Sequence, residues 1–165
     1  MKKTKSNKDG LTIRALTSKD ANAYFQIAQE DSEMKRFTNF FVVNSIDEAK
    51  KKIVSYTSHN EAVYGLFTKS NRLVAVFDVN DDFNDDDGDV DGAVVHYFVG
   101  RKYRGNNYAY RGIKKLAVEL AHEYIKFKFE VRKTNHASIA VQAKLGSEMD
   151  TSYASKDCNL FVYNI

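Results

Sequence analysis

Apolar residues recur along the first half of the chain with two different periods. Alternation of apolar and polar residues is typical of a half-buried strand, and apolar residues three and four apart are typical of a helix. Two helices open with a capping-box pattern, Thr17-x-x-Asp20 and Ser45-x-x-Glu48. The segment from Asp31 to Phe41 fits either a short helix or a loop rich in apolar side chains. The patterns predict strands at residues 11–16, 63–68 and 73–79, and helices at 17–29 and 45–58.

The second half of the chain shows the same two periods. Ala109 begins a continuous apolar stripe at helical spacing. Gly112 weakens that helix by about 1 kcal/mol relative to Ala, and nothing in the sequence explains it. The last predicted helix has Thr134 or Asn135 as its N-cap and ends at Gly146. The patterns predict strands at residues 93–99, 127–131, 148–154 and 158–165, and helices at 109–124 and 137–145.

This order of elements predicts an α+β fold with one mixed, mostly antiparallel central sheet flanked by helices. We expect residues 11–165 to form a single domain and residues 1–10 to be a flexible tail. No apolar run is long enough to span a membrane, and the N-terminus lacks the apolar region of a secretory signal. Cys158 is the only cysteine, which excludes an internal disulfide and leads us to expect a cytoplasmic location.

An acidic segment separates the third and fourth predicted strands. Eight aspartates lie between Asp78 and Asp91, and we expect residues 80–92 to form a solvated loop. The run from Asp87 to Gly92 matches the start of a calcium-binding loop. Phe98 stands where such a loop needs a glutamate, and no helices flank the run. We therefore expect no metal site.

The stretch from Tyr97 to Ala121 is expected to lead from a strand through a tight turn into a helix. The first N–H groups of a helix have no partner within the helix, and its dipole adds partial positive charge there. Such a turn binds anions. Arg101, Lys102 and Arg104 lie beside it in the sequence. The sequence therefore predicts a turn that binds pyrophosphate, with a solvated basic face as the alternative.

The residues of this turn resemble the acyl-CoA loop of the GNAT superfamily of acyl-CoA N-acyltransferases. The family loop is Arg/Gln-x-x-Gly-x-Gly/Ala after the fourth strand. Here Arg104-Gly105-Asn106-Asn107-Tyr108-Ala109 matches it at Arg104 and Ala109, and Asn107 replaces the middle glycine. Asparagine is the non-glycine residue that best tolerates positive φ, so it can keep the loop geometry.

A second motif resembles one branch of the same family. The stretch Asn135-His136-Ala137-Ser138, followed by Lys144-Leu145-Gly146, is similar to the Asn-x-x-Ser helix that ends in Lys-Leu-Gly. That pattern belongs to the branch that acetylates protein N-termini, including those of ribosomal proteins. Ser147 replaces the final phenylalanine of the family pattern.

The resemblance implies an acetyl-CoA-dependent N-acetyltransferase. Such an enzyme transfers the acetyl group of acetyl-CoA, its co-substrate, to a primary amine by direct attack through a tetrahedral intermediate, and it needs no metal. The end of the fourth strand would hold the pantetheine, and the loop amides would bind the pyrophosphate beside Arg101, Lys102 or Arg104. The residues implied at acetyl-CoA are Phe98, Val99, Gly100, Arg101, Arg104, Gly105, Asn106, Asn107, Tyr108, Ala109 and Asn135.

The resemblance also implies three groups for the chemistry. The N–H of Val99 would stabilise the oxyanion. Ser138 would protonate the leaving thiolate, because Gln142 occupies the place where many relatives have a tyrosine; a simple helix-surface hydroxyl is the alternative. His96 would accept the amine proton, with Glu130 as the second candidate base. A hydrogen-bonded sheet histidine is the alternative interpretation of His96.

Two other functions fit parts of the sequence. A catalytically decayed acyl-CoA-binding or interaction module would explain Asn107 and Gln142. A nucleic-acid binder would use the basic residues near the turn, but the acidic segment and the net charge of +3 argue against it. We expect no membrane partner, a monomer or homodimer, and an amine acceptor that is a protein N-terminus, a polyamine or another small cation drawn by the aspartates. The basic residues that a nucleic-acid binder would use are Arg101, Lys102, Arg104, Arg111, Lys114 and Lys115.

Overall fold

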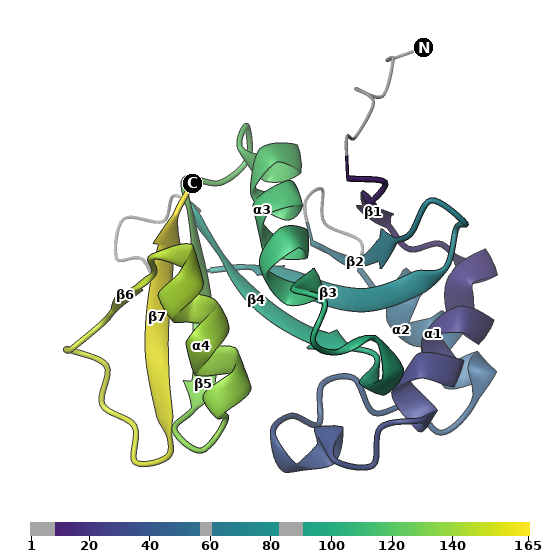
Figure 1. The fold of residues 1–165 in the computed structure, drawn as a ribbon, viewed down its shortest axis with the longest axis horizontal. Helices are drawn as coiled ribbons and strands as arrows, with labels where there is room; N and C mark the ends of the chain where they lie inside the picture. The colour runs from purple at the N-terminus through teal and green to yellow at the C-terminus, as the bar shows by residue number, and fades with distance from the viewer. Residues whose placement is uncertain (1–8, 57–60, 83–90) are drawn as a thin grey trace.

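The computed structural model describes residues 9–56, 61–82 and 91–165 (Figure 1). These residues form one sheet of seven strands in the order β1-β2-β3-β4-β5-β7-β6. Neighbouring strands are antiparallel, except that β4 and β5 are parallel. The predicted α+β fold with a mixed, mostly antiparallel sheet is confirmed. The elements are β1 (Thr12–Ala15), α1 (Ala21–Gln29), α2 (Ile46–Val54), β2 (Ala62–Phe67), β3 (Leu73–Asp81), β4 (Gly92–Val99), α3 (Tyr108–Leu120), β5 (Lys126–Arg132), α4 (His136–Leu145), β6 (Glu148–Met149) and β7 (Cys158–Asn164).

Helices cover both faces of the sheet and bury two apolar cores (Figure 1). The helices α3 and α4 pack on one face, and α1 and α2 pack on the other. Successive side chains of a strand point to opposite faces. Phe77 and Tyr97 therefore lie on the α3 side, whereas Val76 and Phe98 lie on the α1 side.

Gly112 of α3 lies directly against the ring of Phe77 in β3. A Cβ atom added at position 112 would lie only 2.2 Å from Cζ of Phe77. The glycine therefore allows the helix to approach the sheet closely, at a cost in helix propensity of about 1 kcal/mol. This contact explains a glycine that the sequence alone does not.

The strands β4 and β5 pair over only a short distance. Residues 92–94 of β4 pair with residues 126–128 of β5, and the described pairing ends there. Beyond this point the two strands separate, and the backbone groups that face the gap are not used by the sheet. The gap lies between α3 and α4 on one face and the loop before α2 on the other.

Several predicted boundaries differ from the structure, among them the helix predicted at 109–124, which ends at Leu120. The helix α2 ends at Val54 rather than Ser58, and the Ser55 hydroxyl donates to the Lys52 carbonyl at 2.8 Å. The strand predicted at 148–154 stops at Met149. The carboxylate of Asp150 accepts hydrogen bonds from the N–H and hydroxyl of Ser152, at 2.9 and 2.6 Å, which makes a turn. The uncertain segment 31–41 is a loop with one 3-10 turn at Met34–Arg36.

The acidic segment does not begin as the solvated loop that we expected at 80–92. The strand β3 continues into it, and the side chain of Asp78 just before it is fully buried. That carboxylate accepts hydrogen bonds from Tyr56 Oη at 2.6 Å and Asn80 Nδ2 at 3.0 Å, and it lies 3.3 Å from Lys52 Nζ. Such partners offset the cost of removing a carboxylate from water.

Two expectations fall largely outside the described residues: the flexible tail at 1–10 and the calcium-like run from Asp87 to Gly92. Their structure is therefore not part of the description. Within the described ranges, no helix combines the length and the apolar character needed to cross a membrane.

Candidate active site

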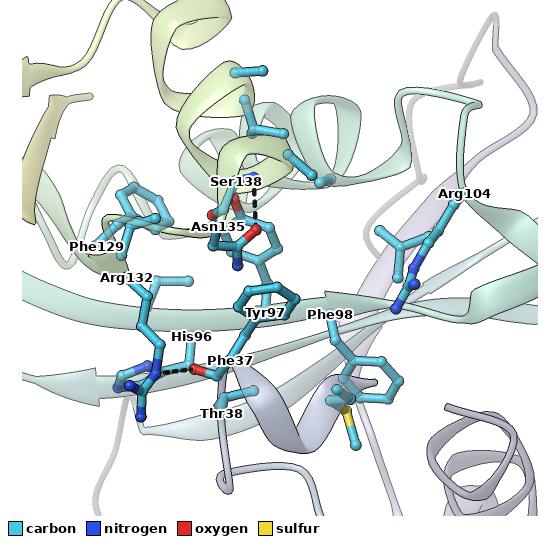
Figure 2. Close-up of a pocket in the computed structure, with 18 of the residues that line it drawn as sticks. Phe37, Thr38, His96, Tyr97, Phe98, Arg104, Phe129, Arg132, Asn135 and Ser138 are labelled. Carbon is cyan, nitrogen blue, oxygen red and sulfur yellow. Dashed lines mark hydrogen bonds between the residues drawn. The ribbon is translucent and has the colours of Figure 1, made fainter. Parts of the chain in front are cut away.

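A cavity of about 660 Å³ opens where β4 and β5 diverge (Figure 2). Its walls are the loop before α2, the second half of β4, the turn before α3, β5 and α4. This volume lies in the usual range for small-molecule sites. Of the predicted site residues, Gly100, Arg101 and Asn106 do not line the cavity. Those that line it are His96, Phe98, Val99, Arg104, Gly105, Asn107, Tyr108, Ala109, Glu130, Asn135 and Ser138.

The end of β4 presents backbone groups to the gap. The N–H of Gly100 donates to the Val74 carbonyl of β3 at 2.9 Å. Along a strand, the N–H groups of successive residues point to opposite sides. The N–H of Val99 therefore points away from β3, into the space where β5 has separated. The same alternation turns the backbone of Phe98 toward β3, and its side chain packs between Tyr24 and Phe41 in the α1-side core.

The turn before α3 has the conformation of an anion site. Asn107, the N-cap residue, has φ of 58° and ψ of 25°, and Gly105 has φ of 82°. The side-chain amide of Asn106 donates to the carbonyls of Tyr103 at 3.0 Å and Arg104 at 3.3 Å, which closes the turn. The left-handed conformation places the following amides at the N-terminus of a 13-residue helix, where the helix dipole favours an anion.

The cations around the turn are placed differently from the prediction. The guanidinium of Arg104 forms an ion pair with the buried carboxylate of Asp31, and Lys102 Nζ lies 3.1 Å from Glu30. Lys144 of α4, which the sequence reading did not single out as a cation of the site, donates to Asn107 Oδ1 at 3.0 Å. Positive charge at the turn therefore comes from α4 as well as from the turn itself.

The N-terminus of α4 brings Asn135 and Ser138 to the cavity (Figure 2). Asn135 is the N-cap, and its Oδ1 accepts a hydrogen bond from the N–H of Ser138 at 3.2 Å. The hydroxyl of Ser138 lies 2.6 Å from the phenol oxygen of Tyr97 in β4. Burial raises the pKa of Tyr97, so this phenol stays protonated. Sequence reasoning missed Tyr97 because only the fold brings β4 next to α4.

His96 lies at the other mouth of the cavity. Its ring stacks on Phe40 with centroids 4.0 Å apart. Burial lowers the pKa of His96, and the charges of Asp78 and Glu130 oppose that effect. A lowered pKa keeps the imidazole neutral near pH 7, so it can accept a proton. Glu130 lies in the same wall, and its carboxylate accepts a hydrogen bond from Tyr153, an interaction that raises the pKa of Tyr153 to about 12.

The cleft therefore crosses the sheet from one face to the other. His96 and Tyr97 are neighbours in β4, and their side chains point to opposite faces. A donor that carries phosphate groups can lie along the α3 and α4 side, while a second reactant approaches His96 from the side of Phe40. Between them, the backbone N–H of Val99 can stabilise negative charge. A fold and site of this kind define a group-transferring enzyme that acts on an acyl donor.

The sequence comparison places the chain within that class. Residues 10–148 match the acetyltransferase (GNAT) domain. The protein therefore belongs to the GNAT family and is an acetyl-CoA-dependent acyltransferase. A search of curated protein sequences gave no significant match.

Solved structures of acetyltransferases share this fold. RimL, a ribosomal L7/L12 alpha-N-protein acetyltransferase in complex with coenzyme A, has a TM-score of 0.78 at 18% identity, over 94% of each chain. An acetyltransferase from Salmonella typhimurium that modifies the N-terminal serine of L7/L12 has a TM-score of 0.76 at 18% identity, over 94% of this chain and 95% of that one. A spermidine N-acetyltransferase chimera from Vibrio cholerae and hSSAT has a TM-score of 0.72 at 14% identity, over 94% and 95%.

Proposed function

We propose that this protein transfers the acetyl group of acetyl-CoA to a primary amine by direct attack through a tetrahedral intermediate. The observation that carries the proposal is the cleft between β4 and β5. It combines a turn suited to anions, an inward N–H at Val99 and a partly buried histidine of lowered pKa in one cavity. Each of these features serves a different need of acetyl transfer from a thioester.

The residues present fit acetyl-CoA. The amides from Arg104 to Ala109 would hold the pyrophosphate, because Asn107 keeps the left-handed conformation that orients them. Lys144 contacts this turn and would supply positive charge to the pyrophosphate. The charge of Arg104 is instead paired with the carboxylate of Asp31. Asn135 lines the cavity and would contact the pantetheine part of acetyl-CoA. The proposed cofactor set is Val99, Arg104, Gly105, Asn107, Tyr108, Ala109, Asn135 and Lys144, which line the cavity, with the backbone amide of Asn106 in the turn. Phe98, Gly100 and Arg101 leave the predicted set, because Phe98 and Gly100 turn their N–H groups toward β3 and Arg101 does not line the cavity.

The proposed chemistry assigns one task to each of three residues. His96 takes a proton from the attacking amine, directly or through water, as the C–N bond forms. The N–H of Val99 stabilises the negative charge that develops on the carbonyl oxygen. The C–S bond then breaks, and Ser138 gives its proton to the thiolate sulfur. Glu130, which lies on the same side of the sheet as His96, is the second candidate base.

The acceptor that we propose is a protein N-terminus, a polyamine or another small cationic amine. Structural neighbours of this chain act on the N-terminus of L7/L12 and on spermidine. The charges of Asp78, Glu130 and Lys52 act on His96, so carboxylates outnumber ammonium groups among the charges near it. Such charge favours a cationic amine over a neutral one.

A panel of amines tests this function. The protein is mixed with acetyl-CoA and either spermidine or a basic peptide with an N-terminal serine, and thiol release and product mass are measured. We expect an acetylated product with at least one amine, and a kcat about a hundredfold lower in Ser138→Ala. Ser152→Ala, in the turn after β6, is the control and should keep its activity. Binding of acetyl-CoA without transfer to any amine would instead support the decayed acyl-CoA-binding module.

A further inference from the structure

A series of polar side-chain contacts, two of them hydrogen bonds, leads from the end of α4 to Ser138. The hydroxyl of Ser147 donates to Oε1 of Gln142 at 2.8 Å. Gln142 is fully buried, although glutamine is mostly an exposed residue. Tyr97 lies between Gln142 and Ser138, and its phenol oxygen is 2.6 Å from Ser138 Oγ. Ser147 and Gln142 are both departures from the family pattern, and here they belong to one network.

The chemistry of these groups sets the direction of the hydrogen bonds. Because Oε1 of Gln142 accepts from Ser147, the amide nitrogen is the end left for Tyr97, and an amide nitrogen can only donate. Its interaction with the phenol oxygen lowers the pKa of Tyr97, although burial, which raises that pKa, is the larger effect. The contact between the Gln142 amide nitrogen and the Tyr97 phenol oxygen is weaker than a hydrogen bond, because this nitrogen has no hydrogen-bond partner in the described part of the chain. An N–H group that faces the phenol oxygen favours an arrangement in which the phenol proton is directed at Ser138.

We propose that Tyr97 is a positioning residue that fixes the proton of Ser138. The phenol O–H donates to Ser138 Oγ, so the serine proton is not held by Tyr97 and points into the cavity, toward the sulfur of bound coenzyme A. This inference rests on the proposed function, which places that sulfur beside Ser138. Tyr97 itself transfers no proton to the sulfur, because its O–H is directed at Ser138 Oγ instead. It acts only through the orientation of Ser138.

The arrangement compensates for Gln142. Many relatives have a tyrosine at that place on α4, which glutamine cannot replace as an acid. Here a phenol reaches the same region from the neighbouring strand, and Tyr97 and Ser138 both line the cavity. Phe129 packs edge-on against the Tyr97 ring with centroids 6.0 Å apart, which restrains the ring from the β5 side.

The pKa of the thiol of bound coenzyme A tests the proposal without any acceptor. The bound thiolate is measured by its ultraviolet absorbance as a function of pH, in wild type and variants saturated with coenzyme A. A hydrogen bond from Ser138 stabilises the thiolate, so Ser138→Ala should raise the thiol pKa by about one unit. Tyr97→Phe removes only the phenol oxygen and should raise it by about half a unit. The double variant should match Ser138→Ala alone, because Tyr97 acts through the serine.

The control is Tyr124→Phe, which removes the hydroxyl of another buried tyrosine, one that donates to Asp81 and does not line the cavity. It should leave the thiol pKa unchanged. A wild-type thiol pKa in Tyr97→Phe, or a further rise from Ser138→Ala to the double variant, would overturn the proposal. Failure of wild type to bind coenzyme A would overturn the proposed function first. Binding without acetyl transfer to any amine would contradict that function but leave this test intact.

Kinetics provide a second readout once an amine acceptor from the panel is found. Tyr97→Phe should lower kcat about tenfold and leave the KM for acetyl-CoA within about twofold, because the phenol does not hold the cofactor. In the Ser138→Ala background the same substitution should leave kcat unchanged. A Tyr97→Phe variant that raises KM and keeps kcat would show a binding role and contradict the proposal.

Discussion

Gly112 shows how one residue sets the distance between a helix and the sheet. Its hydrogen lies against the Phe77 ring, and the room for a methyl group is absent. Gly112→Ala should therefore destabilise the protein by about 1–3 kcal/mol through overpacking, although alanine favours helices. Urea unfolding gives the value. Phe77→Leu in the same chain should remove most of the penalty, and a stabilised Gly112→Ala variant would contradict the contact.

Asn107 keeps the anion-binding turn in the left-handed conformation, with φ of 58°. Glycine adopts this conformation freely, whereas alanine is strained in it by about 1 kcal/mol. Asn107→Ala should therefore be less stable than Asn107→Gly by about 1 kcal/mol in urea unfolding. Equal stability of the two variants would show that the turn is not left-handed in solution.

These residues also show where sequence reasoning works and where it stops. The tolerance of asparagine for positive φ is a local property, so the conformation of Asn107 could be predicted from the sequence. The reason for Gly112 lies in Phe77, which is distant in the chain. The partner of Ser138 lies in β4, and the partner of Arg104 is Asp31 at the end of α1. Contacts between elements depend on the fold, and spacing along the chain does not reveal them.

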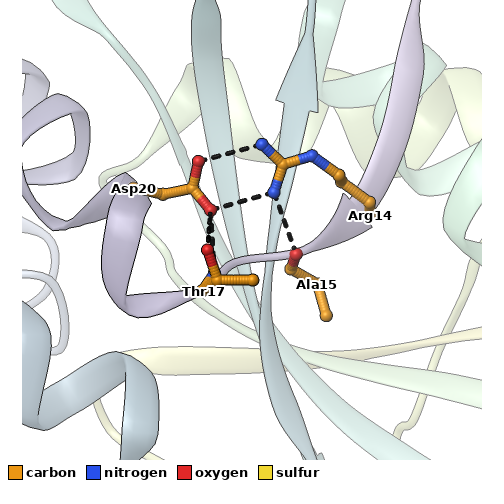
Figure 3. A network of polar contacts seen from close by, with 4 residues as sticks. All are labelled: Arg14, Ala15, Thr17 and Asp20. Carbon is orange, nitrogen blue, oxygen red and sulfur yellow. Dashed lines mark hydrogen bonds and ion pairs between the residues drawn. The ribbon is translucent and has the colours of Figure 1, made fainter.

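An ion pair joins β1 to the start of α1 (Figure 3). Arg14 donates two hydrogen bonds of 2.9 Å to the carboxylate of Asp20, and that carboxylate also accepts from the N–H of Thr17 at 2.8 Å. The hydrogen bonds from Arg14 are the main reason why the pKa of Asp20 falls to about 2. Arg14 also stacks over the Phe67 ring at 4.0 Å, a contact that does not depend on pH.

This pair predicts a pH dependence of stability. The pKa of Asp20 is lower in the folded state than its ordinary value of 3.8, so the stabilisation is complete above about pH 4 and is lost as the pH falls toward 2. Arg14→Met should cost about 1 kcal/mol at pH 7, discounted for solvent screening, and less at pH 2. Urea unfolding from pH 7 to 2 measures both. Lys102→Met, which breaks an exposed pair with Glu30, is the control; a pH-independent cost of Arg14→Met would refute the assignment.

The strand β4 carries the proposed base, and its environment predicts a pH–rate profile. The neutral form of His96 is the active one, and its pKa lies below 6.5 because of burial. The kcat/KM for acetyl transfer should rise with pH through a value below 6.5 and then level off. His96→Gln should lower kcat about a hundredfold and remove this rise. If His96→Gln keeps both rate and profile while Glu130→Gln loses them, Glu130 is the base.

At the same scale, strong local signals predicted elements well and weak ones did not. The helix α4 begins after Asn135 and ends at Gly146 with φ of 73°, as the cap residues predicted. The strand predicted at 148–154 stops at Met149, because the Asp150 carboxylate accepts a hydrogen bond from the N–H of Ser152 and the chain turns there. β3 extends to Asp81, further than predicted, because Asn80 and Asp81 pair with β4 despite their polar side chains.

Across the whole molecule, the divergence of β4 from β5 creates the site. The element order and two motifs were enough to predict the fold and the left-handed turn before α3. The cleft itself comes from the end of pairing after Val94, which no sequence pattern marks. The fold also brings acidic side chains next to four of the basic residues that were considered for nucleic-acid binding. Lys102 and Arg104 pair with acids at the end of α1, and Arg111 and Lys115 contact Asp9.

Binding of acetyl-CoA in this cleft can be measured by a calorimetric titration of the whole protein. We expect one acetyl-CoA per chain, and about 2.7 kcal/mol of added stability at a hundred times Kd. Lys144→Met should weaken binding about tenfold, because it removes a charge beside the turn, while Lys69→Met, in the β2–β3 hairpin, should not. If the wild-type protein shows neither heat of binding nor a rise in Tm at millimolar acetyl-CoA, acetyl-CoA does not bind in the cleft.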